Sequence, residues 1–317
     1  MRIALVTPAG ARARNGNRHT ALRWAAFLRA AGHRVALSTQ WSGSEADLLL
    51  ALHALRSYDS IRRFAASYPQ RRLLVALTGT DVYRDIRVSG EARESLALAD
   101  RLITLQPMAA AELPAPLRRK VRVVVQSSAT TLRQDPVAKR FRVCVIGHLR
   151  AEKDPLRIVA ALSYLDDIQV IHVGAALDES LGSQALAAMR RDSRYRWLGA
   201  VPHGRALAWL ASSHAMVISS RMEGGANVVC EALRVGVPVL ASRIPGNVGL
   251  LGKRYPAYFA LEDEKALAEL IQRAATDRKF YKRVKNAVER LRPMVAPRAE
   301  ARALLDALKA DPSGTKS

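Results

Sequence analysis

The chain has 317 residues and a formal net charge of +22, with 50 Lys and Arg residues against 28 Asp and Glu residues. Its hydrophobic content of 49% is typical of a globular protein, and its length predicts two domains that each bury a core. Its apolar runs are far shorter than the roughly 20 residues that a membrane span needs. We therefore expect no membrane span, and because the first residues resemble a strand we expect no signal peptide.

The positive charge would attract nucleic acid, anionic membranes or phosphates. A nucleic-acid surface usually combines a basic stripe with stacking aromatic residues, whereas here the basic residues are scattered and aromatic residues make up only 5%. We therefore expect no nucleic-acid partner, and a small phosphorylated ligand fits the charge as well. Cys144 and Cys230 belong to no zinc-binding pattern and suit a reducing compartment, which predicts a cytoplasmic location.

Short apolar runs alternate with amphipathic stretches, which is typical of parallel sheets covered by helices on both faces. Helices are expected between the strands, for example over 20–31, closed by Gly32, and over 90–100. The predicted strands span 2–8, 33–39, 47–53, 72–79, 101–106 and 121–127, then 141–147, 168–174, 195–201, 214–220 and 237–242.

The polar segment 129–140 contains a proline and no periodicity, so it is interpreted as a linker. This predicts an α/β protein of two doubly wound, Rossmann-like domains, at 1–130 and 131–290. Basic helical segments follow, and the last part, 291–317, could pack back on the first domain. Ligands of such sheets bind beyond the carboxyl ends of the strands, where the candidate motifs fall.

Two glutamates, Glu223 and Glu231, are separated by seven residues after the predicted strand 214–220. Gly224 and Gly225 follow the first and would let a ligand approach the backbone. The next amides begin a helix, which is a ready phosphate site, and a carboxylate at Glu231 could accept two hydrogen bonds from a ribose diol. The alternative is a solvated helix residue and a charge that complements the helix dipole, but the spacing and the glycine pair favour a ligand site.

A second cluster, VIGHLRAEKDP (145–155), places Gly147, His148, Arg150 and Lys153 after a strand. Asp154-Pro155 predicts the start of the next helix. Cationic side chains at this place could stabilise the charge that grows on a departing diphosphate. An ordinary loop before a helix is the alternative.

The first half holds polar residues at comparable places. Three arginines surround a Gly16-Asn17 turn into a helix, which would make a strong anion site. His53 could instead be a capping or core histidine, and Asp81 an N-cap or turn residue. The candidates are Arg12, Arg14, Asn17, Arg18, His53, Thr78, Thr80, Asp81 and Gln126.

The E-x7-E pattern, the segment GVPVLAS (236–242) with Gly246, and the match of Gly147, Leu149 and Lys153 to a G-R-L-x-x-x-K element resemble family 4 of the GT-B glycosyltransferases. The resemblance covers the C-terminal half. It implies two Rossmann-like domains facing across a cleft, and a nucleotide-sugar donor. His148 stands where the family has arginine, so the resemblance leaves open whether His148 or Arg150 contacts the diphosphate.

The resemblance also implies roles in donor binding. Lys153 and a neighbouring cation would neutralise the diphosphate, Glu231 would hold the ribose, and Glu223 with the backbone that follows it would hold the sugar. The implied donor-binding residues are Gly147, His148, Arg150, Lys153, Glu223, Gly224, Gly225, Ala226, Asn227, Val228 and Glu231.

The segments NGNRHTALRWA, ALHALRS, LTGTDVYRD and GHLRAEKDP resemble a narrower group over nearly the full chain, the selenosugar synthases of selenoneine biosynthesis. The group joins selenophosphate to a UDP-sugar, usually UDP-N-acetylglucosamine. The resemblance implies no cofactor and no essential metal, and a functional link to a selenophosphate synthetase and a selenoneine-forming enzyme. The implied acceptor-binding residues are Arg12, Arg14, Asn17, Arg18, Thr78 and Gln126, and the implied catalytic residues are His53, Thr80, Asp81 and Lys153.

Three alternatives stay open at this point. The acceptor could be a conventional sugar phosphate or lipid carrier. The enzyme could be a nucleotide-sugar epimerase or hydrolase, since sugar-nucleotide epimerases share this fold. A non-catalytic nucleic-acid binder is disfavoured, because base recognition does not require the two glutamates and Lys153.

Overall fold

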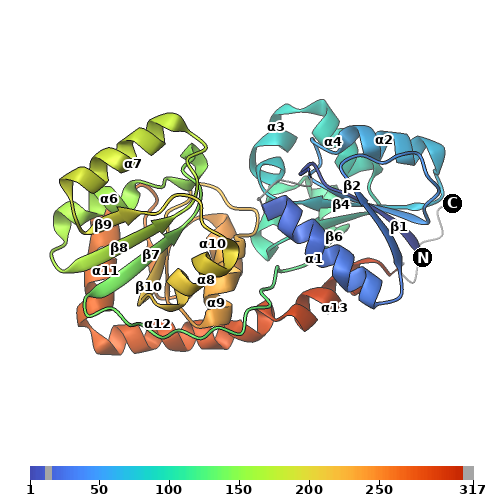
Figure 1. The fold of residues 1–317 in the computed structure, drawn as a ribbon. Helices are drawn as coiled ribbons and strands as arrows, with labels where there is room; N and C mark the ends of the chain where they lie inside the picture. The colour runs from blue at the N-terminus through green and yellow to red at the C-terminus, as the bar shows by residue number, and fades with distance from the viewer. Residues whose placement is uncertain (11–15, 310–317) are drawn as a thin grey trace. The chain divides into compact units, whose positions relative to one another are not determined.

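The computed structural model describes residues 1–10 and 16–309, so Arg12 and Arg14 lie outside the described residues. The chain divides into two α/β units (Figure 1). Unit 1 comprises Met1–Gln126 together with the C-terminal segment from Pro297, and unit 2 comprises Ser127–Ala296.

Unit 1 is built on a parallel sheet of six strands in the order β2-β1-β3-β4-β5-β6. The first strand lies inside the sheet, because the chain adds β2 on one side of β1 and then β3 on the other. Ligands of doubly wound sheets bind at such a reversal of strand order, beyond the carboxyl ends of the strands. The strands are β1 (Arg2–Val6), β2 (Arg34–Ser38), β3 (Leu48–Leu52), β4 (Arg72–Leu77), β5 (Arg101–Thr104) and β6 (Val121–Val123).

Helices cover both faces of this sheet, which explains why β3 is apolar and buried along its whole length. On one face Leu48 and Leu50 pack with α1 and α13, and on the other Leu49 packs with α2 and α4. The helices are α1 (Gly16–Ala30), α2 (Tyr58–Ser67), the π-helical turn η1 (Asp81–Asp85), α3 (Ile86–Val88), α4 (Gly90–Leu98), the 3-10 turn η2 (Pro107–Glu112), α5 (Ala115–Arg118) and α13 (Pro297–Ala307).

Unit 2 repeats this plan with a parallel sheet in the order β12-β11-β10-β7-β8-β9. Its strand order reverses between β7 and β10, which are paired neighbours. The strands are β7 (Phe141–Ile146), β8 (Ile168–Val173), β9 (Tyr195–Trp197), β10 (Ala215–Ile218), β11 (Val239–Ser242) and β12 (Tyr258–Phe259).

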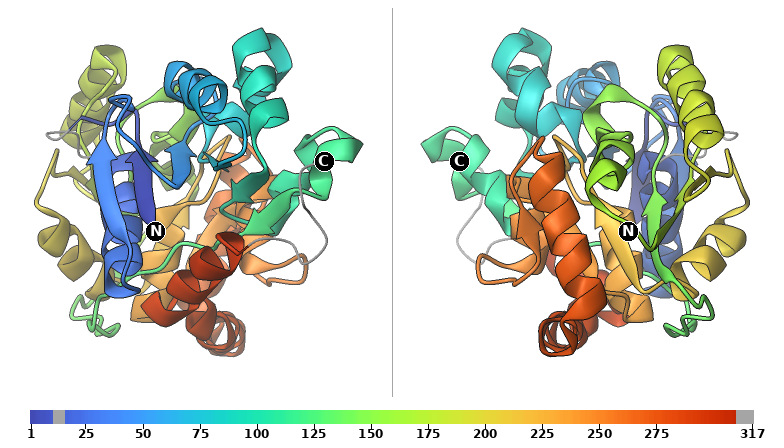
Figure 2. Two further views of the ribbon diagram at one scale, coloured as in Figure 1. Left: turned by 90° about the vertical axis from the view of Figure 1, so that its right-hand side faces the viewer. Right: turned by 90° about the vertical axis from the view of Figure 1, so that its left-hand side faces the viewer.

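The helices of unit 2 begin at polar caps where the sequence offers them. Asp178, Asp263 and Asp277 each accept a hydrogen bond from a backbone N–H in the first turn of α7, α11 and α12. The right-hand view of Figure 2 shows α11 lying lengthwise across the near side of this unit. The helices are η3 (Ala151–Lys153), α6 (Arg157–Ala161), η4 (Leu162–Tyr164), α7 (Glu179–Arg191), α8 (His203–Ala211), α9 (Asn227–Val235), α10 (Pro245–Leu251), α11 (Glu264–Thr276), α12 (Arg278–Leu291) and η5 (Arg292–Val295), of which η3, η4 and η5 are 3-10 turns.

Each of the eleven predicted strands is present, although most end a few residues earlier than predicted, and the two-residue strand β12 was missed. The predicted helix start at Asp154-Pro155 is wrong. Asp154 adopts a left-handed conformation with φ of 43°, so the chain turns there and α6 begins only at Arg157. Gly32 and Gly236, with φ of 83° and 93°, follow the ends of α1 and α9. Among the described residues, no helix combines the length and apolarity needed to cross a bilayer.

The helix α13 is tied to α1 by a buried carboxylate. Glu300 accepts hydrogen bonds from Arg23 Nε at 2.6 Å and from Trp24 Nε1 at 2.7 Å, and its side chain has no exposed surface. We expect Glu300→Ala to lower the free energy of unfolding by about 3 kcal/mol, because it leaves the buried Trp24 indole and the partly buried Arg23 guanidinium without this acceptor. Urea denaturation measures this loss.

The matched control is Asp306→Ala on the same helix, which breaks a surface pair with Lys309 and should cost less than about 1 kcal/mol. Equal losses in the two variants would show that Glu300 contributes no more than a surface charge.

Candidate active site

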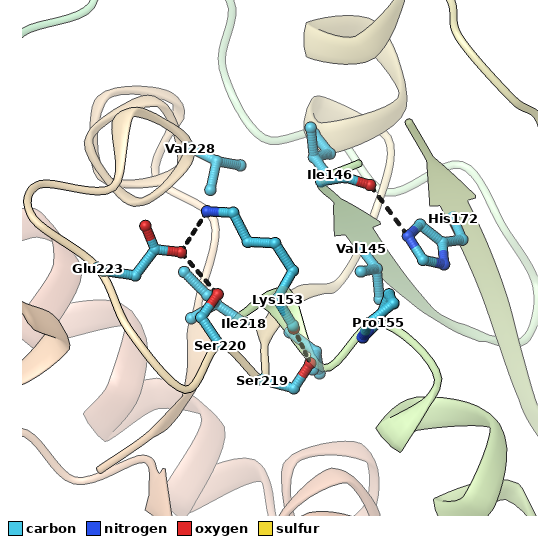
Figure 3. A pocket seen from close by; sticks show the side chains of 12 residues that line it. Val145, Ile146, Lys153, Pro155, His172, Ile218, Ser219, Ser220, Glu223 and Val228 are labelled. Atoms are coloured by element: carbon cyan, nitrogen blue, oxygen red, sulfur yellow. Dashed lines mark hydrogen bonds and ion pairs between the residues drawn. The ribbon is translucent and has the colours of Figure 1, made fainter. Parts of the chain in front are cut away.

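The main candidate site lies in unit 2, where the strand order reverses. The loop after β7 carries Gly147 to Lys153, and the loop after β10 carries Ser219 to Gly225. A pocket beyond the ends of these neighbouring strands is lined by side chains from both loops (Figure 3). The lining residues are Val145, Ile146, Gly147, Lys153, Pro155, His172, Val217, Ile218, Ser219, Ser220, Glu223 and Val228.

Lys153 and Glu223 form an ion pair across this pocket. Lys153 Nζ contacts Glu223 Oε1, and the same oxygen accepts a 2.6 Å hydrogen bond from Ser220 Oγ. Figure 3 shows the lysine side chain reaching over the pocket to the carboxylate. The Glu223 side chain is 7% exposed and that of Lys153 21%, so the charges are largely withdrawn from water. The pair keeps an ammonium and a carboxylate fixed beyond the carboxyl ends of β7 and β10.

Serine hydroxyls hold the backbone of both loops. Ser219 Oγ donates to the carbonyl oxygens of Lys153 (3.2 Å) and Asp154 (2.8 Å). Ser242 Oγ, at the end of β11, donates to the carbonyl oxygen of Ser220 at 2.7 Å. The loops after β7, β10 and β11 are thereby linked in one network, which fixes the backbone that carries Lys153.

Two glycines allow backbone segments to meet at this edge of the sheet. A Cβ added at Gly246 would lie 2.1 Å from the carbonyl oxygen of Glu223, and one at Gly174 would lie 2.0 Å from that of Gly147. Such distances are impossible for a side chain. Gly246 was part of the family pattern, whereas the need for Gly174 could not be seen in the sequence.

Two histidines support the loop after β7. His172 Nε2 lies 3.2 Å from the carbonyl oxygen of Gly147, so this nitrogen donates, and Nδ1 accepts from the Tyr195 hydroxyl at 2.9 Å. Burial lowers the pKa of His172 to about 4, so the ring is neutral near pH 7. His148 Nδ1 accepts the N–H of Ala175 at 3.0 Å. A neutral His148 therefore carries its proton on Nε2. The side chain of Arg150, in the same loop, is exposed.

The second glutamate lies on α9, and its partner was not expected. Glu231 Oε1 is 2.8 Å from Nε2 of His203, the first residue of α8. Gly224, Gly225 and Ala226 lead into α9, and the backbone N–H groups of Ala226, Asn227 and Val228 lie at the N-terminal end of this helix. The sequence signal for His203 was only the Pro202-His203-Gly204 helix start, which marks no ligand site.

Unit 1 holds a second polar cluster, at the ends of β3 and β4. His53 is a non-glycine residue with φ of 76°, and Asp81 to Asp85 form a π-helical turn. Both features are strained or rare, and such features are common at functional sites. His53 Nδ1 accepts the N–H of Arg56 at 3.3 Å, so the proton of the neutral ring lies on Nε2. That nitrogen is 3.2 Å from Thr80 Oγ1, whose hydroxyl donates to Asp85 at 3.3 Å.

Burial is the main cause that lowers the pKa of His53, in spite of the nearby carboxylates of Asp81 and Asp85. Asp81 itself is fully buried, and it accepts hydrogen bonds from the N–H groups of Ala54, Thr78, Gly79 and Val82. Its carboxylate therefore joins the loops after β3 and β4. Asp85 was missed by the sequence interpretation, since nothing in LTGTDVYRD separates it from a solvated residue.

The remaining candidates of unit 1 lie around the start of α1. Asn17 and Arg18 are in its first turn and half-buried. Gln126 is 1% exposed, and its Nε2 donates to Thr20 Oγ1, whose hydroxyl donates to the carbonyl oxygen of Gly16. Gln126 Oε1 is buried and accepts no hydrogen bond within the described residues. An unpaired buried acceptor costs about 1–3 kcal/mol, so this oxygen suits a donor supplied by a ligand.

Residues 130–291 match the family described as glycosyl transferases group 1, which covers just over half of the chain and all of the site in unit 2. The chain belongs to this family. The fold is also that of solved structures of other proteins. HepE from Anabaena in complex with UDP superimposes with a TM-score of 0.80 at 16% identity, over 97% of this chain and 99% of that one. Sucrose-phosphate synthase from Thermosynechococcus elongatus gives 0.75 at 18%, over 96% and 98%.

These findings confirm the predicted fold class, two parallel-sheet α/β units of the GT-B type, and the prediction of a glycosyltransferase. The structure brings Gly147, Lys153 and Glu223 to one pocket. It places His53, Thr78, Thr80 and Asp81 together in unit 1. The individual roles of these residues stay predictions. Within the described ranges, no group of three or more His, Cys, Asp or Glu residues is placed to hold a metal ion.

We expect Gly246→Ala to lower the free energy of unfolding of unit 2 by about 1–3 kcal/mol, because the new Cβ overlaps the backbone of Glu223. Gly204→Ala is the matched control in the same unit, since a Cβ there meets no atom within 4 Å. Urea denaturation of the two variants compares them, and a stable Gly246→Ala protein would show that the Glu223 loop can move aside.

The buried His172 should make unit 2 sensitive to acid. Its folded pKa of about 4 lies below the ordinary value of 6.5, so the unfolded chain binds the proton more readily. Stability from this residue is present above pH 6.5 and lost as the pH falls through about 4, on the order of 3 kcal/mol in total. Thermal unfolding of wild type and His172→Gln between pH 7.5 and 4 measures it, and an unchanged pH dependence in the variant would contradict this assignment.

Proposed function

We propose that this glycosyltransferase is a selenosugar synthase that joins selenophosphate to the sugar of a UDP-sugar, with UDP-N-acetylglucosamine as the expected donor. The observation that carries the donor half is the Lys153–Glu223 pair beside the first turn of α9, at the reversal of strand order. HepE, whose fold is similar, has been crystallised with UDP and with UDP-glucose. The acceptor half rests on the sequence resemblance and on the polar residues of unit 1.

The reaction breaks one bond and forms another at C1 of the sugar. The selenium of selenophosphate attacks C1, the C1–O bond to the diphosphate breaks, and UDP leaves with the electron pair. Water then cleaves the Se–P bond, which releases inorganic phosphate and the 1-seleno sugar. The selenium is already anionic and polarisable, so no strong general base is needed for the first step.

In this proposal the diphosphate of UDP lies against the amides at the start of α9 and the ammonium of Lys153. Lys153 stabilises the negative charge that grows on the leaving group. Glu223, held by Ser220, accepts hydrogen bonds from sugar hydroxyls, and Glu231 accepts those of the ribose diol. His148 and Arg150 supply further cationic or donor groups to the diphosphate.

In unit 1, Arg18 and Asn17 at the start of α1 would bind the phosphate oxygens of the acceptor, together with Arg12 and Arg14. Gln126 holds Thr20 through Nε2, and its Oε1 would accept from a protonated oxygen of the acceptor. Positioning the selenium near C1 supplies much of the rate. His53 and Thr80 would orient the water that cleaves the Se–P bond. Because four amides saturate the carboxylate of Asp81, we now assign it to positioning this loop together with Thr78.

We expect mass spectrometry to find a selenium-bearing sugar and UDP when the protein receives UDP-N-acetylglucosamine and selenophosphate, and neither product without selenophosphate. Activity should survive EDTA, because Lys153 and the α9 amides would stabilise the diphosphate without a metal ion. Lys153→Ala is expected to lower kcat by about 100-fold or more, as removal of one such stabilising group does elsewhere.

The arms of this experiment separate the alternatives. UDP release without selenophosphate would indicate a hydrolase. Turnover with a sugar phosphate but not with selenophosphate would indicate a conventional acceptor. Loss of activity in EDTA that Mg²⁺ restores would overturn the metal-free mechanism.

A further inference from the structure

Glu231 is held by a side chain from another helix. His203 Nε2, at the start of α8, lies 2.8 Å from Glu231 Oε1 on α9, and α8 and α9 pack against each other. The Glu231 side chain is 15% exposed, whereas that of His203 is 56% exposed. The carboxylate is therefore largely withdrawn from water, and the imidazole that contacts it is more exposed.

Local electrostatics favour a proton on this nitrogen. The hydrogen bond to Glu231 raises the pKa of His203, although burial acts in the other direction. A cation at the first residue of a helix is opposed by the helix dipole, so the contact with Glu231 is what makes a donating imidazole favourable here. The other charged side chains of α8, α9 and the adjacent strand β7 are Arg205, Arg234 and Arg142, all cationic, which leaves Glu231 as the acceptor among them.

We propose that His203 is a positioning residue of the donor site, which fixes the Glu231 carboxylate so that its remaining acceptor positions face the ribose diol of the nucleotide. This inference rests on the proposed UDP-sugar site. An ionised carboxylate offers about four lone-pair positions, so one hydrogen bond from His203 leaves room for both hydroxyls.

The benefit of His203 is conformational. A free glutamate side chain loses rotamer entropy when it is ordered. Because His203 orders Glu231 before the ligand arrives, this loss of side-chain entropy does not reduce the affinity for the ribose. His203 thus increases affinity only for ligands that use the carboxylate, and it acts through Glu231.

Calorimetry with two nucleotides tests this. UDP presents the diol, and 2′,3′-dideoxyuridine diphosphate lacks both hydroxyls but keeps the base and diphosphate. We expect His203→Ala to weaken UDP binding roughly 3- to 10-fold and to leave the affinity for the dideoxy compound unchanged. His203→Gln, which can donate an N–H to the same oxygen, should restore UDP binding. A misfolded site would weaken both ligands alike.

Arg205→Ala is the matched control, since it removes an exposed side chain two residues further along α8 and should change neither affinity. Glu231→Ala should abolish the preference for UDP over the dideoxy compound. One outcome overturns the role of His203 while the donor site stands. In that outcome the wild type prefers UDP and Glu231→Ala removes the preference, but His203→Ala binds UDP as the wild type does. If the wild type binds no UDP, both the donor site and the role of His203 are overturned.

Discussion

The site in unit 2 depends on one ion pair, at the point where the strand order of the parallel sheet reverses. Lys153 and Glu223 come from loops after two neighbouring parallel strands, β7 and β10, and neither charge is well hydrated. A charge in such a place is tolerated only when it is paired and hydrogen-bonded. Three features hold the two partners in place: the Ser220 hydroxyl, the contact of Ser219 with the backbone of Lys153, and the close approach of the backbone that Gly246 allows.

In unit 1 a buried carboxylate, that of Asp81, holds the loops of the polar cluster in place. Asp81 is closed off by backbone amides from two loops, so its negative charge is compensated by dipoles and not by a cation. This fixes Thr80 and the π-helical turn, and it leaves His53 in a strained conformation beside them. Strain of this kind persists only where the surrounding structure holds the conformation in place, and here the hydrogen bonds of Asp81 do so.

The sequence predicted the strands, the two-unit plan and the place of the motifs, because continuous apolar runs have one stable arrangement when helices cover both sides of a sheet. The boundaries were less accurate: Asp154 turns the chain where Pro155 indicated a helix. Contacts between side chains far apart in sequence could not be predicted. The bonds of Glu231 to His203, of His53 to Thr80 and of Glu300 to Trp24 join elements whose proximity only the fold creates.

The ion pair also limits the charge that this pocket presents in a strongly basic chain. The net charge of +22 acts at long range and is screened by salt, whereas the field within the pocket is set by groups a few ångströms apart. With Glu223 as its partner, Lys153 presents little net charge. In the proposed function, a diphosphate that contacts the ammonium competes with Glu223 for it, and sugar hydroxyls are donors that would replace the ammonium at the carboxylate. A nucleotide-sugar would therefore satisfy both members of the pair, whereas UDP alone would share Lys153 with Glu223 and bind less tightly.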